Sequence, residues 1–130
     1  MLKHYSTMLK VGLLSGQLLA ACGGGVAESP GQAGYPPEMI EAGRTLFSQT
    51  CYACHGPDGK GLPNLGKDLT NSAFVAEHTD EELLAYVKQG RPADDPSNTT
   101  GIAMPPKGGF DYLTDEDILK VIAFVRSIHE

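Results

Sequence analysis

The sequence contains no tryptophan and only three cysteines among its 130 residues. Basic residues are also scarce, because ten lysines and arginines stand against sixteen acidic residues and give a formal net charge of −6. This balance argues against a nucleic-acid partner, since the phosphate backbone requires a basic surface. It suits either a protein partner with a positively charged docking patch or an acidic surface that only keeps an exported protein soluble.

The sequence also lacks an apolar run of the ~20 residues that a membrane-spanning helix needs. Residues 11–21 are mostly apolar, follow Lys3 and Lys10, and end in small residues, which is typical of a secretory signal peptide. The exit Leu-Ala-Ala-Cys, which ends at Cys22, resembles the lipobox of bacterial lipoproteins. That resemblance implies cleavage before Cys22 and lipid attachment to its thiol, which gives a firm membrane anchor once two or more acyl chains are present. The alternative is a plain signal peptide with an incidental cysteine.

Three segments are expected along the chain. A signal peptide covers residues 1–21, and the lipidated cysteine with a flexible linker covers residues 22–36. The linker is rich in glycine and has almost nothing to bury, which predicts a disordered tether. Residues 37–130 then form a single domain of a size for which a bound cofactor would add stability.

Cys51 and Cys54 stand in the motif Cys-Tyr-Ala-Cys-His, which ends at His55. This is the C-x-x-C-H pattern of c-type haem attachment. A thioredoxin-like pair belongs in a βαβ context, and the sequence has no run of buried strands. A zinc site needs four ligands, and there is no second cysteine pair. A disulfide remains possible in an exported protein, although closing so short a loop stabilises little.

Three helices are predicted by their start and stop signals. The first opens at the proline pair 36–37 and ends near Cys51. The second opens with a capping box at 79–82 and ends at Gly90. The third opens with a second capping signal at 114–117 and carries an apolar stripe at helical spacing.

The motif and the helices together resemble class I cytochrome c over residues 37–130. The resemblance implies an all-α fold in which three to four helices wrap around one covalently attached haem c. It implies that Cys51 and Cys54 form thioethers to the haem and that His55 ligates its iron. In that family the first and last helices cross closely at a glycine and an aromatic residue, which Gly43 and Phe47 match; Val121 and Phe124 match their partners on the last helix.

Met104 is followed by proline in a loop shortly before the last helix, which is where this family places the second axial ligand. The resemblance therefore implies a His/Met pair on the iron, and a pair of His55 and His78 is the alternative. Pro63 resembles the family proline whose carbonyl accepts a hydrogen bond from the ligand histidine, although it also reads as an ordinary turn proline. Arg91 and Lys107 are either partners of the haem propionates or solvated surface charges.

The function implied is one-electron transfer in a membrane-associated respiratory or photosynthetic chain, without catalysis by this chain and without a small-molecule substrate. We expect a lipid-anchored protein on the outer face of the bacterial cytoplasmic membrane or in the periplasm. Its partners would be a quinol-oxidising complex and a terminal oxidase or reductase.

Alternatives to a free carrier remain open. The first is a fixed monohaem subunit of a larger redox complex such as alternative complex III, because residues 104–127 resemble such subunits. The second is a haem peroxidase or gas sensor, which requires Met104 to be off the iron. The third is a lipoprotein without haem whose Cys51 and Cys54 form a disulfide.

Overall fold

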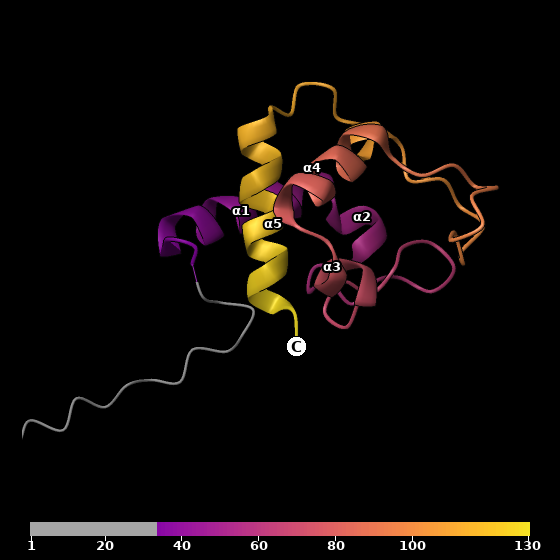
Figure 1. Ribbon diagram of the computed structural model, residues 1–130, viewed down its shortest axis with the longest axis horizontal. Helices are drawn as coiled ribbons and strands as arrows, with labels where there is room; N and C mark the ends of the chain where they lie inside the picture. The colour runs from indigo at the N-terminus through magenta and orange to yellow at the C-terminus, as the bar shows by residue number, and fades with distance from the viewer. Residues whose placement is uncertain (1–33) are drawn as a thin grey trace, which may run out of the picture.

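The computed structural model describes residues 34–130. The expected signal peptide, Cys22 and the linker up to residue 33 lie outside these residues. Within residues 34–130 the chain is helical and forms no strand, only two isolated bridges (Figure 1). The elements are α1 (Pro37–Thr50), α2 (Tyr52–His55), α3 (Ala73–Glu77), α4 (Asp80–Gln89), the 3-10 turn η1 (Pro106–Gly109) and α5 (Asp115–Ile128). No helix in this part of the chain is long and apolar enough to cross a membrane.

The ends of the three long helices follow the local signals in the sequence. Helix α1 begins with a proline in its first turn, and Cys51 is its C-cap. Helices α4 and α5 each begin with a complete capping box, formed by Thr79 with Glu82 and by Thr114 with Asp117. The predicted boundaries of the long helices are therefore confirmed. Helix α3 was not predicted, because five residues are too few to show a periodic pattern.

Helices α1 and α5 cross in direct backbone contact (Figure 1). A methyl group on Gly43 would lie 1.8 Å from the carbonyl oxygen of Lys120, so only glycine fits at the crossing. One turn later the rings of Phe47 and Phe124 pack with their centroids 5.2 Å apart. Phe47 is 1% exposed and belongs with Val121 to one buried cluster, so the expected crossing is confirmed.

A second buried cluster joins the other side of α5 to α4. It consists of Leu83, Leu113, Ile118 and Ile122. Because α5 contributes to both clusters, it is the central element of the domain. The loops around residues 56–72 and 90–105 lie on the same side of α5 as α2 and α3 (Figure 1).

Arg126 on α5 ties several segments together by polar contacts. Its guanidinium donates hydrogen bonds to the carbonyls of Val75 and His78 and pairs with Asp80 at 3.2 Å. The hydroxyl of Tyr35 donates to the other oxygen of the Asp80 carboxylate. Arg126 therefore fixes the ends of α3 and α4, and the start of the described chain, against the last helix.

Candidate functional site

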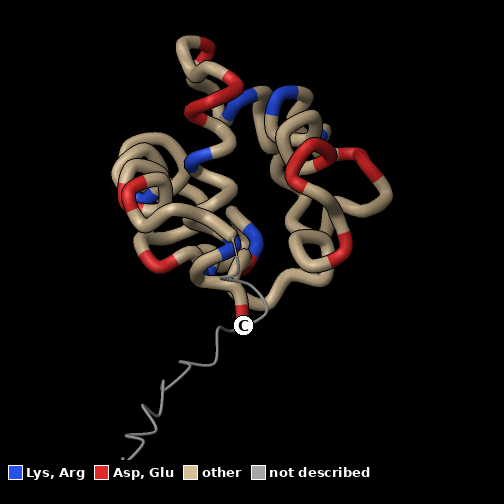
Figure 2. The backbone as a smooth tube through the Cα atoms, turned by 60° about the vertical axis from the view of Figure 1, so that its left-hand side comes forward, with Lys and Arg blue, Asp and Glu red and all other residues tan. Residues whose placement is uncertain are grey.

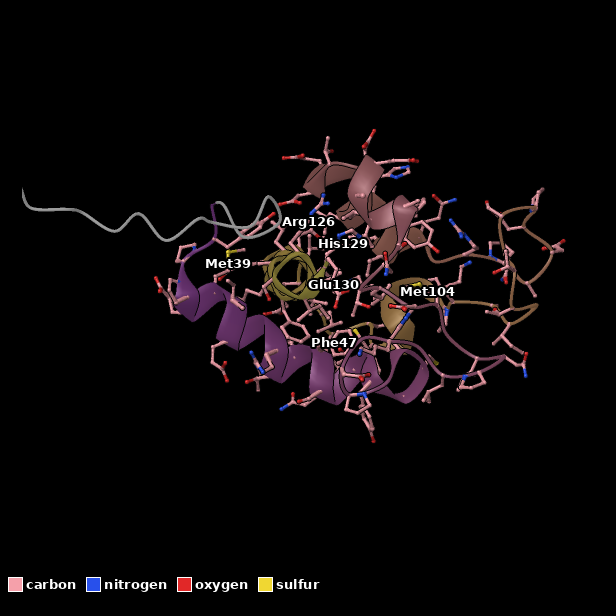
Figure 3. All side chains as sticks on the ribbon, turned by 90° about the horizontal axis from the view of Figure 1, so that it is seen from below. Met39, Phe47, Met104, Arg126, His129 and Glu130 are labelled. Carbon is pink, nitrogen blue, oxygen red and sulfur yellow. The ribbon has the colours of Figure 1, made fainter. Side chains whose placement is uncertain are left out.

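A cavity of about 210 Å³ lies between α5 and the loops that face it. Cys51, Cys54 and His55 line it from the junction of α1 and α2, and Met104 lines it from the loop before η1. The structure thus brings together these four residues, which lie up to 53 positions apart in the sequence. Figure 3 shows Met104 and Met39 on opposite sides of α5, which is seen end-on, and Met39 is not part of the lining.

The walls of this cavity are mainly apolar. Side chains from both the helices and the loops take part: Phe47, Leu65, Leu69, Phe74, Val75, Leu83, Val87, Ile102, Leu113, Ile118, Val121, Ile122 and Val125. A run of four polar residues lines the cavity at positions 97–100, and Thr50 and Ser72 contribute hydroxyl groups elsewhere. The cavity therefore suits a largely apolar occupant that carries polar groups at one edge.

The charged residues of the lining have one sign. They are Lys67, Arg91 and Lys107, and no carboxylate from residues 34–130 lines the cavity. Acidic residues are distributed over several sides of the molecule instead (Figure 2). In a chain with a net charge of −6, an all-cationic lining indicates an occupant with anionic groups.

The cysteine pair is set by a helical turn at the end of α1. The amides of Cys54 and His55 donate to the carbonyl of Cys51, at 3.2 and 3.0 Å, so the three side chains are spaced by one turn. Burial raises the pKa of the Cys51 thiol, which lies 3.3 Å from the Thr50 hydroxyl. The following loop packs tightly on this turn, because a methyl group on Gly66 would lie 2.2 Å from the carbonyl oxygen of Cys54.

The His55 ring is oriented by a backbone carbonyl. Its Nδ1 lies 2.9 Å from the carbonyl oxygen of Lys67, which can only accept, so Nδ1 carries the proton. Burial lowers the pKa of this imidazole, while the Lys67 carbonyl acts in the opposite direction. A neutral ring with Nδ1 protonated keeps the lone pair of Nε2 free to bind a metal.

The carbonyl expected to hold His55 was that of Pro63, and this prediction is wrong. Pro63 lies exposed in a tight turn closed by the bridge between Leu62 and Gly66, and it does not line the cavity. The turn carries the chain outward before it returns to the histidine at Lys67. No sequence signal could have identified Lys67, because the functional atom belongs to the backbone.

Lys67 also spans the two loops at the edge of the cavity. Its ammonium group donates a hydrogen bond to the hydroxyl of Thr99 at 2.7 Å. Thr99 belongs to the polar stretch 97–100, on the loop that leads to Met104. The residue that orients His55 through its carbonyl therefore contacts the opposite loop through its side chain.

Met104 is positioned by an isolated antiparallel bridge. The amide of Arg91 donates to the carbonyl of Met104 at 2.8 Å, and the amide of Met104 donates to the carbonyl of Arg91 at 2.9 Å. The approach requires glycine at position 90, which has φ 72° and whose Cβ would lie 2.4 Å from the Met104 oxygen. The end of α4 and the loop segment at Met104 are thus fixed to each other.

The remaining candidates differ in their surroundings. His78 does not line the cavity; its Nδ1 lies 2.8 Å from the Phe74 carbonyl and its ring stacks on that phenylalanine. The Arg91 guanidinium packs over the rings of Phe74 and Tyr86, at 5.0 and 4.8 Å from their centroids. The Lys107 ammonium donates to the carbonyls of Leu113 and Asp111, at 2.7 and 3.2 Å, so it holds the loop before α5.

Comparison with known proteins gives a consistent family. Residues 38–125 match the family described as cytochrome C oxidase, cbb3-type, subunit III. The chain is 30% identical over 96 residues to the cbb3-type cytochrome c oxidase subunit CcoP of Azospirillum brasilense, covering 70% of this chain and 31% of that protein. It is 33% identical over 93 residues to subunit FixP of Sinorhizobium medicae, covering 68% of this chain and 30% of that protein.

The chain is also similar in sequence to a protein that is not an oxidase subunit. The chain is 30% identical over 97 residues to photosystem II extrinsic protein V of Trieres chinensis, covering 68% of this chain and 60% of that protein. The chain spans about a third of the length of the oxidase subunits it matches. No solved structure matches it.

A cytochrome c domain carries a covalently bound haem c, and the residues present fit that group. Two thiols, a neutral imidazole and a thioether line one apolar cavity, and the charges in its lining are all positive, as the two carboxylates of a haem require. The helical architecture agrees with the matched family over residues 38–125. The chain therefore belongs to the cytochrome c family, in the group of domains related to subunit III of cbb3-type cytochrome c oxidase.

Proposed function

We propose that this chain is a one-electron transfer domain with a single covalent haem c, attached through Cys51 and Cys54 and ligated by His55 and Met104. The observation that carries the proposal is the convergence of these four side chains on one cavity. When bound, the haem supplies the one-electron iron couple. The surrounding residues then decide how that couple is held and how accessible it is.

The two axial residues define the chemistry. His55 offers Nε2 because the Lys67 carbonyl engages Nδ1. Met104 offers a soft thioether, which favours the ferrous state and raises the potential. With both positions filled, an outside molecule finds no open coordination site, so the domain is expected to transfer electrons and not to catalyse a reaction.

Arg91 is our preferred partner for a haem carboxylate. A guanidinium offers five N–H donors, and the bond of Arg91 to the Ser97 carbonyl at 3.3 Å uses one of them. Its stacking on Phe74 and Tyr86 keeps the group at the cavity wall. Lys107 is a weaker candidate, because its ammonium already donates to two carbonyls.

We propose further that the domain works as a fixed component of a larger redox complex. The similar proteins are described as oxidase subunits and as an extrinsic protein of photosystem II, which favours this role over a freely moving carrier. The lipid anchor on Cys22 and a location on the outer face of the membrane remain part of the proposal. The partners would then be a quinol-oxidising complex and a terminal oxidase.

The first experiment tests the haem and its ligands. The full chain is produced in a bacterial host that exports it and attaches haem, and its intact mass is measured by mass spectrometry. The mass should include one haem, whereas a loss of two hydrogens without haem would show a disulfide. Ferric wild type should show the sulfur-to-iron charge-transfer band and bind no carbon monoxide when reduced.

Variants then assign the sixth ligand. Met104→Ala should abolish the charge-transfer band and let the reduced protein bind carbon monoxide. The matched control is Met39→Ala, which removes a methionine from the far side of α5 and should leave the spectrum unchanged (Figure 3). A wild type that is high-spin and binds carbon monoxide readily would favour the peroxidase or sensor alternative.

The second experiment separates a subunit from a carrier. Membranes containing the protein are solubilised in mild detergent and separated by native electrophoresis, and haem absorbance locates the chain. A subunit migrates with a large complex, and Cys22→Ser keeps it there while removing the anchor. Release of the Cys22→Ser variant as a monomer, with the wild type also migrating alone, would contradict the subunit role.

A further inference from the structure

The loop between Arg91 and Met104 has a polar brace at its centre. Residues 92–103 contain no helix or strand, and the bridge between Arg91 and Met104 closes the neck of the loop. Met104 follows the loop directly, so its position depends on how well the loop is held. The side chain of Asn98 lies inside this loop and also lines the cavity.

The amide group of Asn98 connects both arms of the loop. Its Nδ2 donates to the carbonyl of Pro92 at 2.9 Å and to the carbonyl of Ile102 at 2.8 Å. Pro92 is one residue after Arg91, and Ile102 is two residues before Met104. Both N–H donors of the amide are therefore used to hold the ends of the loop together.

The oxygen of the same amide holds the turn in between. Oδ1 accepts hydrogen bonds from the amides of Thr100 and Gly101 and from the Thr100 hydroxyl, each at 3.0 Å. Gly101 has φ 70°, a left-handed conformation that the chain needs at this point. The Asn98 side chain therefore uses its full hydrogen-bonding capacity within one loop.

Neither aspartate nor alanine can replace these contacts. Aspartate has nearly the same shape but has no donor, and it would place a negative charge against the carbonyls of Pro92 and Ile102. Alanine removes the brace altogether. A site holds a weak ligand such as a thioether best when surrounding hydrogen bonds fix the ligand's position in advance.

We propose that Asn98 is a positioning residue for Met104, and that its amide keeps the thioether in place for the iron. This inference rests on the proposed His/Met ligation. Without the brace the loop opens more often, and the thioether leaves the cavity more often. An external ligand then competes more successfully for the coordination site.

The test measures imidazole binding to the ferric protein, matured with haem as the full chain. Asn98→Ala and Asn98→Asp should both keep the covalent haem and the helical circular dichroism. Asn98→Asp loses the two hydrogen bonds that Nδ2 donates, and Asn98→Ala loses all five contacts of the side chain. Each variant should raise the apparent affinity for imidazole by roughly tenfold or more and weaken the charge-transfer band. Two variants are used so that a folding defect in one does not decide the result.

The matched control is Asp95→Ala. The carboxylate of Asp95 accepts from the amide and hydroxyl of Ser97, at 2.8 and 2.6 Å, so it braces the same loop without joining its arms. Its imidazole affinity should stay within about twofold of wild type. Equal shifts in Asp95→Ala and Asn98→Ala, or none in either Asn98 variant, would overturn the proposal.

A second readout does not depend on the iron. The amide of Met104 donates to the Arg91 carbonyl, so its hydrogen-exchange rate reports opening of the loop neck. Asn98→Ala should speed this exchange relative to Asp95→Ala, and unchanged exchange would contradict the brace. If instead wild type and Met104→Ala bind imidazole equally, the His/Met ligation fails, and the exchange rates still decide the role of Asn98.

Discussion

The helix crossing and the ligand loops are stabilised by different interactions. At the crossing of α1 and α5, buried aromatic rings and the backbone contact at Gly43 dominate. In the loops, short side chains cap nearby backbone groups, as Asp68 does for Thr70 and Asn98 does for Thr100. The crossing depends on contacts between distant segments, whereas these side-chain caps act within a few residues.

Because of this difference, the residues that stabilise the fold are largely separate from those that position the iron ligands. The crossing fixes α5, whose inner side forms one wall of the cavity. His55 and Met104 approach from the loop side, where single backbone contacts orient them. We therefore expect changes at the crossing to affect stability first, and changes in the loops to affect the iron first.

The largest effect is expected when the cofactor cannot be attached. In the double variant Cys51→Ala/Cys54→Ala, a cavity of about 210 Å³ loses its occupant. At about 24 cal/mol per Å³ this costs roughly 5 kcal/mol, which approaches the whole stability of a small domain. Urea denaturation followed by circular dichroism measures the loss, with Cys22→Ser as the control. A double variant as stable as wild type would show that the attached haem does not stabilise the domain.

Gly43→Val tests the crossing directly. The added carbons meet the Lys120 carbonyl, so α1 and α5 must separate, and the free energy of unfolding should fall by about 3 kcal/mol or more. Gln49→Val adds the same side chain at an exposed position of α1 and should cost less than about 1 kcal/mol. Similar losses for the two variants in thermal denaturation would show that the crossing is not the tight contact described above.

Arg126→Met removes the polar tie between α5 and the segment from α3 to the start of α4. The carbonyls of Val75 and His78 and the carboxylate of Asp80 lose their donor, at a cost of about 2–4 kcal/mol. Arg44→Met is the control, because its ion pair with Glu41 is largely exposed and should contribute less than about 1 kcal/mol. Denaturation midpoints compare the two, and the charge-transfer band should be unaffected in both.

Thr114→Ala probes a purely local signal. It removes the hydroxyl that accepts from the Asp117 amide at 3.1 Å at the start of α5, which should cost about 1 kcal/mol. Ser48→Ala, at an exposed position within α1, is the control and should change stability by less than about 0.5 kcal/mol. A loss of several kcal/mol for Thr114→Ala would mean that Thr114 does more than cap the start of α5.

The smallest effect is a pH dependence at Tyr35. Burial, followed by the hydrogen bond to Asp80 and its charge, raises the pKa of this phenol to about 12. A raised pKa favours the neutral form in the folded state, so the stabilisation is complete below about pH 10 and is lost as the pH rises towards about 12. Because solvent reaches much of the ring, we expect less than about 1 kcal/mol.

Urea denaturation between pH 9 and 11 tests this dependence, in a window that spans the ordinary tyrosine pKa of about 10. Tyr35→Phe should flatten the alkaline decline in stability relative to wild type. Tyr112→Phe, at a residue that is 67% exposed, is the matched control. A steeper decline in Tyr35→Phe would reverse the sign of the effect and exclude the assigned cause.

Much of the fold could be predicted because its signals are local. The capping boxes at Thr79 and Thr114 and the stop at Gly90 define helix ends within a few residues. The expected match of Gly43 and Phe47 with Val121 and Phe124 came from the family resemblance, and the packing confirms it. The short helix α3 was missed, because five residues are too few to show a helical spacing of apolar residues.

The sequence by itself determined the attachment motif, since Cys51, Cys54 and His55 are recognisable by type and spacing, and the resemblance to class I cytochrome c implied that Met104 joins them. Only the tertiary structure decided which backbone groups hold them: the Lys67 carbonyl in place of that of Pro63, and the braces around Asn98. The physical reason is that every residue carries the same carbonyl and amide. Which of them meets a given side chain depends on the path of the folded chain and not on the residue's identity.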